Sequence, residues 1–216
     1  MKHEYGFSYK EYPIEQGTAL FSDGSRLKTH DIMSELPSWM SEADLIFTDG
    51  PWNTGNLKSF YTKAEIEPEY NLKFEAFYHR FFECVAEISP ETCYAEIGKE
   101  YLADYITEMR KIFKHVTFFN SSYYHKPSNF CYIVRGAKTS HKGLHLDDID
   151  EEDIIDWIGK NEKYSVIGDL CIGRGLVALA AYKNKKRFVG TELNHKRLSV
   201  ALKRLINEGA SYEISM

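Results

Sequence analysis

The chain of 216 residues corresponds to one full domain or slightly more, and its 43% hydrophobic and 27% charged residues are typical of a globular protein with a sizeable core. The formal net charge of −5 excludes a strongly basic protein that coats nucleic acid through charge alone. No apolar run approaches the roughly 18 residues of a membrane span, no signal-peptide core follows the start, and the four scattered cysteines argue against a disulfide scaffold, so a cytoplasmic protein is expected.

Alternating strands and helices are expected along the first half of the chain. In chain order, the apolar patterns predict a strand at 18–23, a helix at 29–36, a strand at 43–49, a helix at 72–88, a strand at 92–97 and a helix at 101–113. The strand at 43–49 has the pattern of a buried strand, and Gly50-Pro51 ends it.

The second half continues this alternation. The patterns predict strands at 116–120 and 130–134, an acidic helix at 147–160, a strand at 165–171, a helix at 175–182, a strand at 188–192 and a helix at 195–206. The whole predicts a mostly parallel sheet with helices on both faces. Because binding sites in such sheets lie at the carboxyl ends of the strands, functional residues are expected just after Ser22, Thr48, Ile97 and Leu170.

A glycine-rich turn follows the strand at 165–171 and opens the next helix. Gly173 and Gly175 lack a Cβ, so the backbone can turn tightly and approach a ligand, and Glu192 ends the next strand where a carboxylate would hold a ribose hydroxyl pair. A third glycine and a phosphate-loop lysine are missing, which favours a nucleoside cofactor without pyrophosphate, S-adenosylmethionine. The alternative is a structural turn without a ligand, in which Glu192 is a helix-start carboxylate.

Asp49-Gly50-Pro51-Trp52 directly follows the strand at 43–49. The segment 44–56 resembles the Asp-Pro-Pro-Tyr/Trp block of amino-group DNA methyltransferases, and 169–181 resembles their Asp-Pro-Phe-x-Gly-x-Gly block. The catalytic block comes before the cofactor block, an order similar to the circularly permuted beta class of that family. The resemblance spans about residues 17–206, and it implies a Rossmann-like α/β fold with a seven-stranded sheet, one methyltransferase domain over 1–216 and an N-terminal extension at 1–16.

The resemblance also implies roles for individual residues. The exocyclic amino nitrogen of a base is a poor nucleophile because its lone pair is delocalised, and Asp49 with the Gly50 carbonyl would accept its two N–H groups. Trp52 would stack on a flipped-out base, and the stretch 53–63 is expected to be flexible and to close over it. The remaining implied residues are Pro51 in the catalytic block; Asp23, Asp169, Cys171, Gly173, Gly175 and Glu192 at the cofactor; and Asn53, Lys58 and Lys126 at the substrate.

The sequence departs from the family pattern at three places. The first proline of the catalytic block is Gly50, which keeps the carbonyl but loses rigidity, and Leu170-Cys171 replaces a proline and an aromatic residue. Both changes leave room for a slow or inactive member. Only about ten residues, 137–146, stand where the family carries a target-recognition region. The short segment has three possible consequences: relaxed sequence specificity, a partner subunit that recognises DNA, or a substrate other than duplex DNA.

The leading hypothesis is methyl transfer to an exocyclic amino group of a DNA base, with adenine N6 favoured over cytosine N4 by the resemblance at Asp49. The alternatives are an impaired subunit that acts as a scaffold, an RNA amino-methyltransferase, and a Gly-Pro turn without catalytic role. A homodimer or a separate recognition subunit is expected. Neither membrane binding nor a metal ion is expected. The stretch 183–204 has eight basic residues and one acidic, and forms either a solvated helix face or a rim that faces phosphates.

Overall fold

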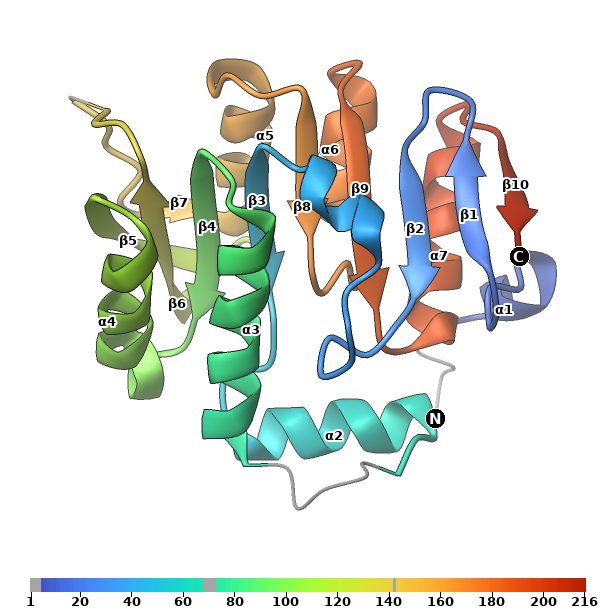
Figure 1. The fold of residues 1–216 in the computed structure, drawn as a ribbon, viewed down its shortest axis with the longest axis horizontal. Helices are drawn as coiled ribbons and strands as arrows, with labels where there is room; N and C mark the ends of the chain where they lie inside the picture. Colours follow the sequence, from blue (N-terminus) through green and yellow to red (C-terminus); the bar gives the residue numbers. More distant parts are fainter. Residues whose placement is uncertain (1–4, 68–72, 142) are drawn as a thin grey trace.

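The computed structural model describes residues 5–67, 73–141 and 143–216. Its strands are β1 (Thr18–Phe21), β2 (Arg26–Thr29), β3 (Leu45–Asp49), β4 (Thr92–Ile97), β5 (His115–Tyr123), β6 (Lys126–Ala137), β7 (Ile149–Asp150), β8 (Val166–Asp169), β9 (Arg187–Glu192) and β10 (Tyr212–Ser215). Among the described residues they form one ten-stranded sheet in the order β10-β1-β2-β9-β8-β3-β4-β6-β5-β7 (Figure 1). The central strands β2, β9, β8, β3 and β4 run parallel, so their carboxyl ends share one edge.

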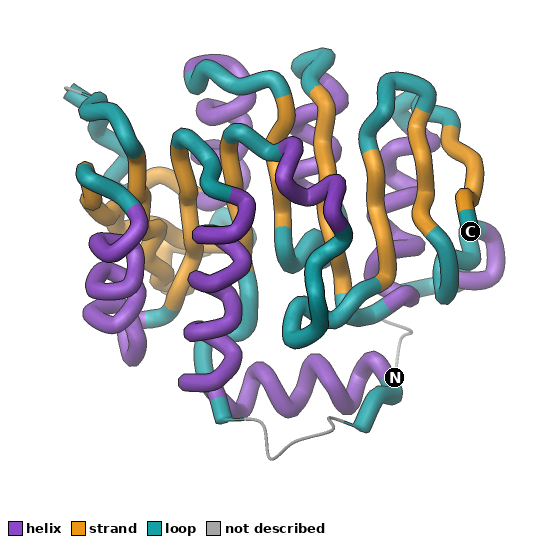
Figure 2. Tube along the Cα trace, viewed as in Figure 1, coloured by secondary structure: helices purple, strands orange, loops and turns teal. Residues whose placement is uncertain are grey.

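Helices cover both faces of this sheet and its carboxyl edge. They are α1 (Ser8–Glu11), α2 (Thr54–Ala64), α3 (Phe74–Ile88), α4 (Leu102–Ile112), α5 (Glu151–Asn161), α6 (Leu176–Lys183) and α7 (His195–Asn207), with the 3-10 helices η1 (Ser38–Glu42) and η2 (Lys99–Tyr101). Figures 1 and 2 show α3 and α4 in front of the sheet, α5, α6 and α7 behind it, and α2 across the edge where the parallel strands end. Each face buries its own apolar cluster.

The central strands are buried because they carry near-continuous apolar runs. In β3 the side chains of Leu45, Ile46 and Phe47 are buried, and β4 is buried along its whole length. Helix α3 places its phenylalanines at helical spacing against this layer. This packing fixes where β3 and β4 end, and therefore where the polar side chains at their carboxyl ends lie.

The expected α/β sheet is confirmed, but it is wider than the expected seven strands. Strands β10 and β1 extend it beyond β2, and β7 adds a short strand beside β5. The helix expected at 29–36 is wrong. Thr29 ends β2 and pairs with Glu192 of β9, so sheet pairing overrides the local helical pattern.

The expectation that the stretch 53–63 is flexible is also wrong, because nearly all of it forms α2. The side chain of Asn53 caps this helix and accepts the backbone N–H of Asn56 at 2.9 Å. The side chains of Leu57 and Tyr61 are buried on one face of the helix. A folded helix therefore lies across the carboxyl edge of the sheet.

The strands expected at 116–120 and 130–134 are longer than predicted and form one hairpin, β5–β6. Its turn holds Tyr124 and His125 in the left-handed region, with φ of 59° and 50°. The connection between β6 and β7 spans residues 138–148, which leaves no room for a large inserted domain. Within the described part of the chain, no helix combines the length and the apolar character of a membrane span.

Candidate active site

A cavity of about 390 Å³ opens at the carboxyl edge of the sheet. It lies between the ends of β3, β4 and β8 and the first turns of α5, α6 and α7, and both Asp49 and Gly173 line it. The parallel pairing of β3 with β8, in which Leu45 lies opposite Ile167, places these two strand ends side by side. The cavity therefore joins the two segments that the sequence analysis singled out, and its size is that of a small-molecule site.

The glycine-rich turn is held by two carboxylates. Asp169, at the end of β8, accepts the backbone N–H of Cys171 at 2.9 Å. Glu192, at the end of β9, accepts the N–H of Gly173 at 2.8 Å with one oxygen and the N–H of Asn194 at 2.9 Å with the other. Each carboxylate thus fixes the backbone that surrounds the cavity and keeps further lone pairs for a ligand.

Gly175 meets two demands that only glycine satisfies. Its φ is 79°, a left-handed conformation that other residues rarely adopt, and a Cβ there would lie 2.6 Å from the Cβ of Ala201. The missing side chain therefore lets α7 pack directly against the start of α6. Gly173 also has a positive φ, of 57°.

Gly175→Ala is expected to destabilise the protein by more than about 1 kcal/mol, because the new methyl group meets Ala201 and the backbone is strained. Chemical denaturation measures this free energy of unfolding. The double substitution Gly175→Ala with Ala201→Gly should recover part of the loss, since it removes the overlap but not the strain. An unchanged stability of the single variant would contradict this account of the turn.

Asp49 ends β3, and its side chain is exposed to the cavity. Its Oδ1 accepts the indole N–H of Trp52 at 2.9 Å. Desolvation within the cavity raises the pKa of Asp49 to about 6, and the Trp52 hydrogen bond and the charge of Arg197 oppose this rise. Trp52 itself packs on Gly98 and meets Tyr123 edge to face, with ring centroids 5.3 Å apart.

Gly50 and Pro51 connect this corner to the layer beneath it. A Cβ on Gly50 would make ordinary contacts, at 3.5 Å with Phe77 and 3.6 Å with the Cys171 sulfur. Cys171 therefore lies directly under the segment 49–52. Pro51 is buried and lines a second cavity of about 40 Å³, which Asp49 and Arg197 share with the larger one.

Sequence reasoning missed Asp31, which lies just after β2 at the carboxyl edge. Its carboxylate accepts the hydroxyl of Tyr61 at 2.6 Å and the N–H of Met33 at 3.0 Å, and it lines the smaller cavity. The signal that could have found it was the position of an acid after a strand end, but the helix predicted at 29–36 concealed that strand.

Three further residues of the larger cavity were also missed. Glu96 lies near the end of β4, Glu151 is the first residue of α5, and Arg197 lies in the first turn of α7. The guanidinium of Arg197 lies 5.0 Å from the ring centroid of Phe60, and its Nε is buried without a hydrogen-bond partner among the described residues. Glu96 and Glu151 add two carboxylates next to Asp49.

Several solved DNA methyltransferases resemble this structure. The PvuII cytosine-N4-specific DNA methyltransferase matches with a TM-score of 0.62 and 12% identity over 92% of each chain. M1.HpyAVI matches with a TM-score of 0.56 and 14% identity, over 83% of this chain and 98% of its own. TTHA0409 from Thermus thermophilus, solved with S-adenosyl-L-methionine, matches with a TM-score of 0.60 and 15% identity, over 84% of this chain and 95% of its own.

The chain has the fold of these methyltransferases. No protein-family model and no curated protein matches its sequence. At 12–15% identity the likeness concerns the fold alone. The match extends over nearly the whole length of each of these three structures. This agrees with the expectation that the chain has no large second domain.

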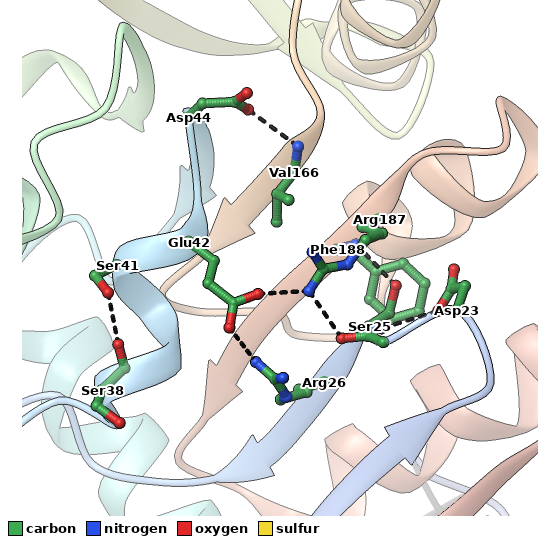
Figure 3. Close-up of polar contacts among 11 residues, drawn as sticks. Asp23, Ser25, Arg26, Ser38, Ser41, Glu42, Asp44, Val166, Arg187 and Phe188 are labelled. Atoms are coloured by element: carbon green, nitrogen blue, oxygen red, sulfur yellow. Dashed lines mark hydrogen bonds and ion pairs between the residues drawn. The ribbon is translucent and has the colours of Figure 1, made fainter.

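Within this methyltransferase fold, the placement of Asp23 at the cofactor is wrong. Asp23 lies in the turn between β1 and β2, where its Oδ1 accepts the N–H of Ser25 at 2.8 Å. Figure 3 shows it at the start of β2, beside the cluster of Arg26, Glu42 and Arg187. Because β1 runs antiparallel to β2, its carboxyl end points to the edge opposite the cavity.

The three residues predicted at the substrate do not line either cavity. Asn53 uses its side chain to cap α2. Lys58 is exposed on α2, and Lys126 is exposed at the start of β6. From α2, Asn56 and Phe60 line the larger cavity instead. A role for Lys58 and Lys126 on a larger substrate stays a prediction.

Most basic side chains of the stretch 183–204 do not form a continuous phosphate-facing rim. Four of them pair with acids: Lys183 with Glu208, Arg187 with Glu42, Lys196 with Glu65, and Lys203 with Glu11. Arg197 and Arg204 line the larger cavity. From this stretch, Arg197 and Arg204 are therefore the basic residues that contribute to the cavity wall.

Proposed function

We propose that the chain is an S-adenosylmethionine-dependent methyltransferase that acts on an exocyclic amino group of a DNA base. The observation that carries the proposal is the shared cavity of about 390 Å³, which Asp49 and Gly173 both line. M1.HpyAVI and TTHA0409, which share the fold, were solved in complex with S-adenosylmethionine. Their complexes support the same cofactor here.

The residues around the two cavities fit this cofactor. Glu192, which lines the smaller cavity, would hold its ribose hydroxyls, since each oxygen accepts only one backbone N–H. Arg197, whose buried Nε has no hydrogen-bond partner among the described residues, would hold its carboxylate. Gly173 and Gly175 would let the backbone approach it, and Asp169 and Cys171 would form the wall beside them. When bound, the cofactor supplies an electrophilic methyl group on a sulfonium.

Asp49 and the Gly50 carbonyl would activate the acceptor nitrogen. Each would accept one N–H of the amino group, which would draw the nitrogen towards tetrahedral geometry and free its lone pair for in-line attack on the methyl group. The methyl–sulfur bond would break to leave a thioether, and the nitrogen would release one proton to Asp49 or to water. No covalent enzyme intermediate is required. Trp52 would stack on the base, an interaction worth about 1–3 kcal/mol. The base must leave the duplex stack to enter the cavity.

Adenine N6 is the proposed acceptor, on the resemblance of the block at Asp49. Cytosine N4 is the second candidate, because the PvuII enzyme with the same fold is named cytosine-N4-specific. The proposal also includes the circularly permuted block order, one domain over 1–216 with an extension at 1–16, and a cytoplasmic setting. The short connection 138–148 favours a homodimer or a separate subunit that recognises DNA, or a single-stranded RNA substrate.

A methyl-transfer assay tests this function. Labelled S-adenosylmethionine is incubated with unmethylated DNA and, in parallel, with RNA oligonucleotides, and the methylated base is identified by mass spectrometry. Incorporation into adenine of DNA is expected. Calorimetric cofactor binding without incorporation would favour the impaired scaffold subunit, which Gly50 and Leu170-Cys171 motivate, and the absence of both would overturn the proposal.

The pH dependence of the reaction gives a second test. Because desolvation raises the pKa of Asp49 to about 6, the acceptor form, the carboxylate, is lost as pH falls through that value. In buffer without divalent cations, kcat/KM is expected to fall about tenfold for each pH unit below about 6. A profile that is flat in this range would exclude the carboxylate role of Asp49.

A further inference from the structure

Three carboxylates converge at the floor of the larger cavity. Asp49 and Glu96 lie opposite one another in the pairing of β3 with β4, and Glu151 begins α5 beside them. One oxygen from each side chain lies within 4.8 Å of the other two. Such a cluster costs free energy unless positive charge or hydrogen-bond donors balance it.

Glu96 is the most deeply buried acid of this cluster, and no cation of the described residues pairs with it. It is 2% exposed, and neither carboxylate oxygen has a hydrogen-bond partner among the described residues. The groups that face it are Asp49, Glu151 and the Cys131 thiol, and burial raises the pKa of Glu96 well above its ordinary value. A buried carboxylate that faces two other acids and a thiol, with no cation beside it, indicates a missing positively charged ligand.

Among the described residues, the cations near this cluster do not pair with Glu96 or Glu151. Arg197 faces Asp49 and Glu192. His125 lies 3.4 Å from Asp150 and 3.5 Å from Glu152 rather than against Glu151. Within the described ranges, no lysine or arginine forms an ion pair with Glu96 or Glu151. Three acids thus share at most one protein cation.

We propose that Asp49, Glu96 and Glu151 bind a divalent cation of the Mg²⁺ and Mn²⁺ class. Such ions prefer carboxylate oxygens. Opposite ligands on Mg²⁺ lie about 4.2 Å apart, so three oxygens that all lie within 4.8 Å of one another are close to the spacing that one ion requires. Water from the cavity would complete the coordination. The sequence could not reveal the site, because its residues come from three distant segments without metal-ligand spacing.

The site extends the proposed function without depending on it. A cation at these oxygens would stabilise the ionised carboxylate of Asp49. The Asp49 Oδ1 that accepts the Trp52 N–H keeps a lone pair for a further contact. Cation binding requires neither the methyl donor nor DNA, so the two proposals can fail separately.

Mn²⁺ titration of the whole chain, without S-adenosylmethionine and without nucleic acid, tests the site. Paramagnetic resonance of free Mn²⁺ is expected to show a single bound ion with a Kd below about 1 mM. Glu96→Gln and Glu151→Gln should each weaken binding about tenfold or more, at least the loss that removal of an outer-shell partner causes. The matched control is Glu152→Gln, a half-buried neighbour on the same cavity wall that lies beside His125 and outside the carboxylate cluster, and it should bind Mn²⁺ like the wild type.

Absence of Mn²⁺ binding by the wild type would overturn the proposal. Unchanged binding by the variant that carries both Glu96→Gln and Glu151→Gln would overturn it as well, because the ion would then lie elsewhere. Both substitutions keep the side-chain shape, and circular dichroism verifies folding. If Glu96→Gln does not fold, Glu151→Gln alone decides between the outcomes. Failure of the methyl-transfer assay would leave the Mn²⁺ result intact and would count only against the proposed function.

Discussion

Asp49→Asn is expected to lower kcat for methyl transfer by roughly 10²–10³-fold, the loss that removal of one preorganised polar group from an active site causes. The asparagine keeps the shape of the side chain, but it replaces one acceptor oxygen with a donor and removes the negative charge. The amino group of the base then loses the carboxylate that accepts one of its N–H groups. Cofactor binding, measured by calorimetry, should change little, because Gly173 and Glu192 hold that side of the cavity.

Asp23→Asn is the matched control for this result. The sequence alone gives both aspartates a place in the site, but Asp23 lies at the opposite edge of the sheet, and its Oδ1 contact with Ser25 survives the change to asparagine. It should methylate DNA like the wild type. An equal loss of activity in both variants would mean that the cavity between Asp49 and Gly173 is not where methyl transfer occurs.

The parts of the site that sequence predicted correctly are those in which one segment carries the whole signal. The apolar run of β3 is buried on both sides, so the sequence predicts its end at Asp49 without knowledge of the neighbouring strands. The turn at Gly173 and Gly175 is equally local, because positive φ angles demand glycine there. Parallel neighbours then bring both ends to one edge by a general rule of such sheets.

The parts that sequence could not predict depend on pairing between distant strands. Asp23 follows β1 and Asp31 follows β2. The parallel pairing of β2 with β9 brings Asp31 to the cavity edge, and the antiparallel pairing of β1 with β2 takes Asp23 to the opposite edge. Glu96 lies opposite Asp49 because of the register between β3 and β4. No spacing along the chain encodes that register, so the carboxylate cluster appears only in the folded structure.

The second large effect is expected in the pH dependence of stability. Asp169 is 3% exposed, and desolvation raises its pKa from 3.8 to about 8, against the opposing hydrogen bond from the Cys171 N–H. Between these two values the native state holds a proton that the unfolded chain has lost. The contribution of Asp169 to the free energy of unfolding therefore falls as pH rises, by about 1.4 kcal/mol per pH unit.

Asp169→Asn removes this titration and keeps an oxygen for the Cys171 N–H. In urea denaturation between about pH 4 and pH 8, the stability of the variant relative to the wild type should increase steadily with pH. Glu42→Gln should behave in the opposite sense. The hydrogen bond from Arg26 lowers the pKa of Glu42, so its stabilisation is present at neutral pH and is lost as pH falls. Parallel slopes for the two variants would show that the cavity wall does not hold Asp169 in its protonated form.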